Sequence, residues 1–77
     1  MTLKQYIEHL NKIVEQHPEA LEYTVVYAMD EEGNAYFPVG FKPSVGLYTE
    51  GGGFSGGEYE PEYAMEEGVS PNAVCIN

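Results

Sequence analysis

The chain of 77 residues is long enough for one small domain, but its core would hold too few side chains to enclose a deep substrate cavity. Thirteen acidic residues face three lysines and no arginine, and the net charge of −10 argues against direct binding to nucleic acid or to an anionic membrane. The single cysteine, Cys75, excludes an intrachain disulfide bond and a zinc site built on paired cysteines.

The same sequence carries no targeting signal that we can identify. Its N-terminal segment lacks a basic stretch followed by an apolar run, and no stretch is apolar over the roughly 18–20 residues that a membrane span requires. We therefore expect a cytoplasmic protein without a membrane partner. Cys75 lies in a short apolar run, which is typical of a small buried hydrophobic residue rather than of a nucleophile.

Residues 2–17 have the spacing of an amphipathic helix. Thr2 is suited to cap its N-terminus, and Pro18 marks its end. On the polar face, Glu8 precedes Lys12 by four residues, and we expect these two side chains to form an ion pair. The opposite face is apolar and consists of Leu3, Tyr6, Ile7, Leu10, Ile13 and Val14.

Residues 22–49 predict a β-hairpin or meander. The segment 22–30, EYTVVYAMD, is rich in β-branched and aromatic residues, which favour a strand. Gly33 tolerates the positive φ of a hairpin loop, and residues 35–41 would return as the second strand. Pro38 cannot donate a ladder hydrogen bond, so it should face outward on an edge strand or sit at a bulge. A short third strand follows it.

Residues 50–71 form an acidic, glycine-rich excursion with six glutamates and no lysine. A short helix over 61–67 would begin with proline and end at a glycine, and residues 72–77, NAVCIN, favour a final strand. The sequence therefore predicts a single α+β domain over 1–77. In it one N-terminal amphipathic helix packs on a small, mostly antiparallel sheet of three to four strands, with the excursion preceding the C-terminal strand.

Several stretches together resemble small acidic proteins encoded by tailed bacteriophages. They are TLKQYIEHLN, PEALEYTVVY, DEEGNAYFPV, KPSVG and NAVCIN, and the similarity is weakest across residues 50–66. None of them is a catalytic motif. The resemblance implies a setting in the host-cell cytoplasm, and it carries over no activity and no functional residue.

The motifs of phosphate binding, metal binding and catalysis are not matched. The glycine-rich run Gly51–Gly57 has no lysine and is flanked by glutamates, which would repel a phosphate group. The acidic hairpin tip at residues 30–34 has neither the length nor the register of a calcium loop. His9 and His17 are eight residues apart on the predicted helix and cannot act as a pair. We expect no cofactor, no metal and no enzymatic activity.

The strongest functional hypothesis is a non-enzymatic accessory protein that binds a host or phage protein through an acidic and aromatic surface. The alternatives are a DNA mimic that inhibits a nucleic-acid-binding host protein, and a metal-binding or enzymatic protein, which the unmatched motifs argue against. A further alternative is an excursion that packs only on its own sheet. Two copies pairing through Val45–Tyr48 or the strand holding Cys75 would give a homodimer. The candidate partner-binding residues are Phe54, Glu58, Tyr59, Glu60, Glu62 and Tyr63.

Overall fold

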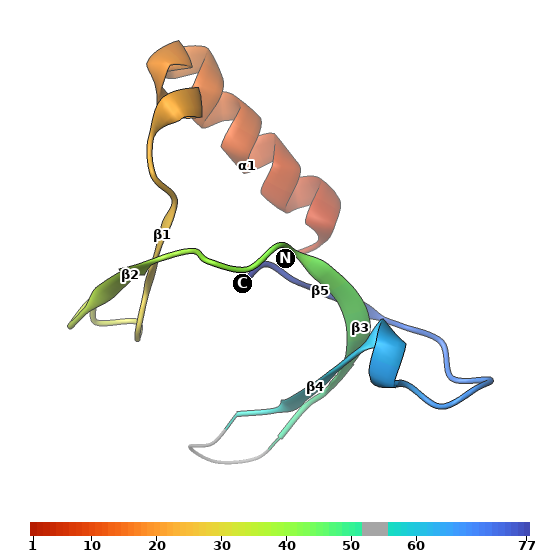
Figure 1. The fold of residues 1–77 in the computed structure, drawn as a ribbon. Coiled ribbons are helices and arrows are strands. Elements are labelled where there is room, and N and C mark those ends of the chain that lie inside the picture. Colours follow the sequence, from red (N-terminus) through yellow and green to blue (C-terminus); the bar gives the residue numbers. More distant parts are fainter. Residues whose placement is uncertain (52–55) are drawn as a thin grey trace. The chain divides into compact units, whose positions relative to one another are not determined.

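The computed structural model describes residues 1–51 and 56–77 and confirms the α+β class (Figure 1). It contains one N-terminal helix and two small antiparallel sheets, so the strands are divided between two sheets instead of forming one. The chain forms two compact units, Met1–Val39 and Gly40–Asn77. That the two units make a single domain stays a prediction.

Unit 1 begins with helix α1, Leu3–Gln16, almost at the predicted bounds. Thr2 and Gln5 form a reciprocal capping box. The Thr2 hydroxyl accepts from the backbone N–H of Gln5 at 3.2 Å, and the Gln5 side chain accepts from the backbone N–H of Thr2 at 2.8 Å. These two bonds satisfy N–H groups that the first turn of a helix otherwise leaves unpaired.

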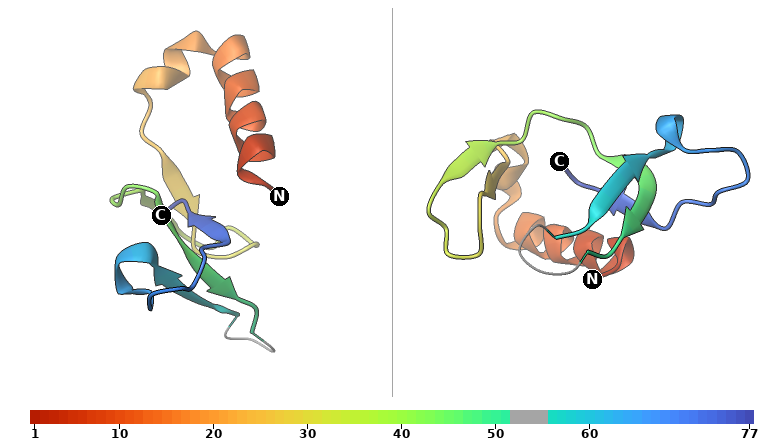
Figure 2. Two further views of the ribbon diagram at one scale, coloured as in Figure 1. Left: turned by 90° about the vertical axis from the view of Figure 1, so that its right-hand side faces the viewer. Right: turned by 90° about the horizontal axis from the view of Figure 1, so that it is seen from below.

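The helix ends at His17, and a 3₁₀ helix, η1, follows over Pro18–Glu22. Figure 2 shows this orange segment continuing from α1 and turning the chain back, and it contacts α1. Packing of α1 on a sheet stays a prediction. Its apolar stripe is 45–51% exposed at the four positions Leu3, Ile7, Leu10 and Ile13.

The charged side chains of α1 do not pair as the sequence predicts. Among residues 1–51 and 56–77 the one close contact between a basic and an acidic side chain joins His17 Nδ1 to Glu19 Oε1 at 3.4 Å, which is an ion pair only when the imidazole is protonated. Glu8 and Lys12 do not form a pair. Both side chains are exposed. Because an exposed pair gains little energy and must immobilise two long side chains, its absence costs α1 little.

The rest of unit 1 is the predicted hairpin. Strand β1, Val26–Ala28, pairs antiparallel with β2, Tyr36–Pro38, with Tyr27 opposite Phe37. The rings of these two residues have centroids 5.8 Å apart in a tilted arrangement. Gly33 has φ of +71° in the connecting loop, as the turn chemistry predicts. The edge position predicted for Pro38 is confirmed, because β2 has β1 as its single partner.

Unit 2 is a three-stranded antiparallel sheet in the order β4-β3-β5 (Figure 1). Its strands are β3, Ser44–Thr49; β4, Glu58–Pro61; and β5, Ala73–Cys75. β3 lies in the middle, with β4 beside Gly46–Thr49 and β5 beside Ser44–Gly46. A second copy pairing along Val45–Tyr48 would compete with these two strands, and a homodimer stays a prediction.

Three features of unit 2 differ from the sequence prediction. Strand β4 lies inside the excursion 50–71, where the sequence predicts a loop. The short helix expected over 61–67 is a single 3₁₀ turn, η3, over Glu62–Ala64. The final strand is shorter than 72–77, and Cys75 is half-buried, with its thiol donating to the backbone carbonyl of Asn77 at 3.0 Å.

Asn72 continues the pairing of β5 with β3 through its side chain. Its carboxamide oxygen accepts from the backbone N–H of Tyr48 at 2.8 Å, and its Nδ2 donates to the carbonyl of Tyr48 at 3.1 Å. The backbone N–H of Asn72 also donates to the carbonyl of Gly46 at 3.0 Å. Asn72 therefore ties the chain leaving η3 to the middle strand.

Among the described residues no apolar side chain is fully buried, and Gly46 in the middle of β3 is the one buried residue. The sheet of unit 2 is thus held mainly by ladder hydrogen bonds and by half-buried side chains that lie across it. No helix within the described ranges combines the length and the apolar character needed to cross a membrane.

Candidate functional site

The β3–β4 hairpin brings most of the predicted partner-binding residues together and sorts them onto two faces. Successive side chains of a strand point to opposite faces of the sheet. The pairs Tyr48–Tyr59 and Gly46–Pro61 lie on one face, and the pairs Leu47–Glu60 and Thr49–Glu58 lie on the other. We call the first the tyrosine face and the second the carboxylate face.

On the tyrosine face, the ring of Tyr59 lies across β3. Its hydroxyl is 2.9 Å from Oγ of Ser44, with which it forms a part-buried hydrogen bond. Gly46 lies beneath the ring, because a methyl group built at this position would be only 2.6 Å from Cζ of Tyr59. Gly46 therefore provides the space that lets the ring of Tyr59 reach Ser44.

Tyr48 makes the reciprocal contact from β3 to β4. A methyl group at Gly57 would lie 2.6 Å from Cε1 of Tyr48 and 2.7 Å from its hydroxyl oxygen. Tyr59 thus covers Gly46 of β3, and Tyr48 covers Gly57, the residue that precedes β4. Glycine is a poor strand former because it lacks a side chain to pack, and these rings supply the missing contact. This pairing holds β4 in register with β3.

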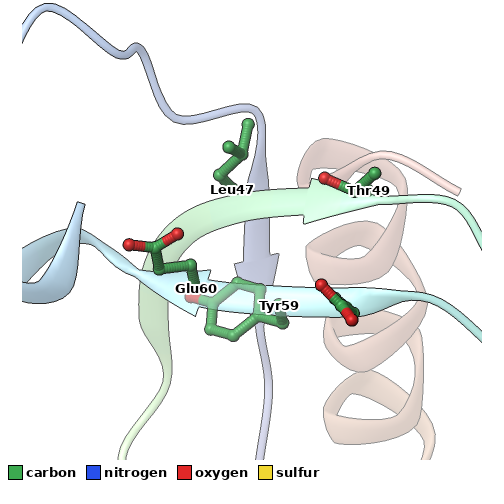
Figure 3. A pocket seen from close by; sticks show the side chains of 5 residues that line it. Leu47, Thr49, Tyr59 and Glu60 are labelled. Carbon is green, nitrogen blue, oxygen red and sulfur yellow. The ribbon is translucent and has the colours of Figure 1, made fainter. Parts of the chain in front are cut away.

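A shallow depression of ≈ 430 Å³ is lined by four residues of the carboxylate face, Leu47, Thr49, Glu58 and Glu60, together with Tyr59, which lies between the two glutamates on β4. Figure 3 shows Leu47 and Thr49 on β3 beside Glu60 and Tyr59 on β4. Glu58 and Glu60 are two residues apart on one strand, so their side chains leave the same face of the strand from Cα atoms roughly 6–7 Å apart. This face therefore presents paired negative charges over a small polar and apolar floor.

The turn η3 extends the acidic surface beyond β4. Glu62 is exposed, and Tyr63 is 91% exposed, which leaves nearly the whole ring free. A second shallow depression of ≈ 490 Å³ is lined by Ser44, Val45, Pro61, Glu62 and Tyr63. An exposed tyrosine beside an apolar depression is the kind of residue that dominates binding energy at protein interfaces.

The carboxylates of this region form no ion pair among the described residues of unit 2. Lys42 is the one lysine of this unit, which has no histidine, and none of Glu58, Glu60 and Glu62 pairs with it. All three side chains are exposed. They can therefore accept hydrogen bonds from an external cationic group and form an ion pair with it, without first breaking an ion pair within unit 2.

The predicted site residues do not all have the same role. Glu58, Glu60, Glu62 and Tyr63 are exposed on β4 and η3. Tyr59 differs, since its hydroxyl is bonded within the sheet and its ring is half-buried, so it positions β4. Phe54 lies outside the described residues. Sequence reasoning missed Ser44, Gly46 and Asn72, and nothing in their local sequence signals that they contact β4 or β3.

At the acidic hairpin tip of unit 1, the carboxylate of Asp30 is hydrogen-bonded to Asn34. One carboxylate oxygen of Asp30 accepts from the backbone N–H of Asn34 at 3.1 Å, and the other accepts from Asn34 Nδ2 at 2.7 Å. The hydrogen bond from the Asn34 side chain, followed by that from its backbone, holds the pKa of Asp30 below its ordinary value. Within the described ranges, no three histidine, cysteine, aspartate or glutamate side chains gather closely enough to hold a metal ion.

The site therefore consists of an open acidic strand, a free tyrosine and two shallow depressions, all carried by unit 2. Shallow, open surfaces of this kind suit contact with a macromolecule, because a small substrate would stay largely in water. Comparisons of this chain with protein-family models, with curated proteins and with solved structures found no match.

Proposed function

We propose that this chain is a non-enzymatic accessory protein that binds another protein through the acidic surface of β4 and η3. Glu58, Glu60, Glu62 and Tyr63 form this surface. The observation that carries the proposal is that Glu58, Glu60 and Glu62, which form no ion pair among the described residues of unit 2, and the 91% exposed Tyr63 follow one another within six residues. Such a surface is complementary to a partner with lysine or arginine around an apolar or aromatic contact.

The resemblance to small acidic phage proteins suggests where the partner is found. On this proposal the protein acts in the cytoplasm of an infected bacterium, and the partner is a host or phage protein with a basic surface. Electrostatic attraction would speed the encounter, and Tyr63 would provide the buried contact that slows dissociation.

The experiment is affinity capture from a lysate of phage-infected bacteria, with quantitative mass spectrometry. We expect a protein captured by the wild type to be lost with Glu58→Gln/Glu60→Gln/Glu62→Gln and with Tyr63→Ala. The matched control is Glu8→Gln/Glu15→Gln/Glu22→Gln, which removes the same charge from exposed positions of unit 1. Equal loss in the control would show that net charge alone retains the partner, and undiminished capture by both site variants would contradict the proposal.

A DNA mimic is the second candidate, because no ion pair within the described part of unit 2 neutralises its acidic side chains, as neutralised carboxylates would be poor phosphate substitutes. On this alternative the captured partner binds nucleic acid, and duplex DNA competes with this chain for it. Competition that disappears with the triple glutamine variant would support mimicry. A partner held undiminished in high salt would argue against it, because salt screens contacts between charges.

A further inference from the structure

The outer edge of β4 is an unpaired sheet edge whose chemistry can be read from the register of unit 2. β4 has β3 as its single neighbour in the sheet. Both backbone groups of Tyr48 bond to the side chain of Asn72, so both point toward the β5 side of β3. Backbone groups of opposed residues in an antiparallel pair point either toward each other or apart. Those of Tyr59, opposite Tyr48, therefore point away from β3.

The direction of the Tyr59 backbone leaves a donor and an acceptor free at this edge. Within the described ranges neither its N–H nor its carbonyl has a backbone partner in the turns and loops. Pro61, two residues on, has the same orientation and no N–H, which fits an outward-facing position on an edge strand. The edge thus offers the N–H and carbonyl of Tyr59 and the carbonyl of Pro61.

The charges beside these backbone groups determine which kind of strand can pair with the edge of β4. Glu58 and Glu60 flank Tyr59 and share one face of β4. A second copy pairing along this edge would place carboxylates close to carboxylates, which is unfavourable. A strand with cations on both sides of its central residue would place each cation against one glutamate. Opposed side chains in such flanking pairs are close, because their Cα atoms are roughly 4.5 Å apart.

We infer that an extended segment of a protein partner, with Lys or Arg at alternating positions, adds to this edge as an antiparallel strand. Its central residue exchanges two backbone hydrogen bonds with Tyr59, and its two cations lie against Glu58 and Glu60. Antiparallel addition is favoured over parallel addition because its hydrogen bonds are slightly stronger per residue, and the rest of the sheet is antiparallel. This inference rests on the proposed function and specifies its mode of binding.

The test uses the full chain and a synthetic peptide, acetyl-TVKVKVT-amide, in which two lysines flank a central valine. Binding is measured by NMR titration, and hydrogen exchange of the Tyr59 amide is followed in the same samples. We expect the peptide to bind at low salt and to slow exchange of the Tyr59 amide. The peptide acetyl-TVEVEVT-amide should not bind, because its carboxylates would oppose those of β4.

Backbone methylation separates strand addition from simple charge attraction. Methylating the nitrogen of the central valine removes the N–H that faces the Tyr59 carbonyl, and it should abolish protection of the Tyr59 amide. Methylating the first lysine instead removes an N–H that points away from β4 and should leave binding in place. Equal binding by both methylated peptides would overturn the inference.

The charge contribution is measured with two variants of this chain. Glu58→Gln/Glu60→Gln should weaken binding of the lysine peptide roughly fivefold, whereas Glu66→Gln/Glu67→Gln, with the same charge change away from β4, should leave it unchanged. Suppose the first variant weakens binding but Tyr59 gains no protection. Strand addition is then wrong, while an acidic binding surface stands. A lysine peptide that does not bind overturns the inference, and capture from lysate still decides the proposed function.

Discussion

The side chain of Asn72 takes the place of a strand residue opposite Tyr48. Continuing the register of β5 and β3 from Ser44–Cys75 would place Pro71 opposite Tyr48. Proline has no N–H, so the carbonyl of Tyr48 would lose its donor there. The carboxamide of Asn72 supplies both the donor and the acceptor, at 3.1 Å and 2.8 Å from the two backbone groups of Tyr48.

Removing this side chain should therefore loosen unit 2. We expect Asn72→Ala to lower the free energy of unfolding by about 1–2 kcal/mol, the sum of two hydrogen bonds to backbone groups. Asn72→Asp keeps the acceptor and loses the donor, and it should fall between wild type and alanine. Urea unfolding and hydrogen exchange of the Tyr48 amide provide the measurement. Asn77→Ala is the matched control and should have little effect, since the Asn77 side chain makes no hydrogen bond to any residue of 1–51 or 56–77.

The hydrogen bond between Tyr59 and Ser44 should contribute to the register of β4. Tyr59→Phe and Ser44→Ala each remove one partner of the 2.9 Å bond, and each should cost about 1 kcal/mol in urea unfolding. The double variant should cost less than the sum of the two, because both substitutions remove the same bond. Additive costs would show that the two hydroxyls act independently. Tyr63→Phe, at an exposed hydroxyl, is the control.

Gly46 should not tolerate even a methyl group. A Cβ at this position would lie 2.6 Å from Cζ of Tyr59 and would also meet the backbone carbonyl of Glu60. We expect Gly46→Ala to destabilise unit 2 by about 1–3 kcal/mol, the usual cost of overpacking. Gly40→Ala is the matched control, because nothing lies within 4 Å of a Cβ there. Thermal unfolding compares the two, and equal midpoints would contradict the close contact of Tyr59 with β3.

The β1–β2 hairpin loop should weaken in acid. Hydrogen bonds from Asn34 lower the pKa of Asp30 from its ordinary value of 3.8. A carboxylate whose pKa is lower in the folded state stabilises that state above pH 3.8. This contribution is lost as the pH falls through the lowered value. NMR titration of Asp30 should show the lowered pKa, and Asn34→Ala should raise it toward 3.8. Glu31→Gln should not, and an unchanged Asp30 in Asn34→Ala would contradict the assigned cause.

The sequence alone determined the elements whose causes are local. Apolar spacing, Thr2 and Pro18 predicted α1 within one residue at each end, since a helix is built from contacts three and four residues apart. The hairpin of β1 and β2 followed from β-branched residues around Gly33, and its edge position followed from Pro38. Four of the six site residues, Glu58, Glu60, Glu62 and Tyr63, were predicted as surface residues from composition alone and are exposed.

Only the tertiary structure decided how unit 2 is arranged. The segment Glu58–Pro61 looks like a loop in sequence, because glutamate and proline disfavour strands. It becomes β4 with the support of two contacts, Tyr59 over Gly46 of β3 and Tyr48 over Gly57, which precedes β4. The same pairing places β3 in the middle of the sheet. It also puts the half-buried ring of Tyr59 on the tyrosine face and Glu58 and Glu60 on the carboxylate face. These contacts join residues far apart in the chain, and no local pattern encodes them.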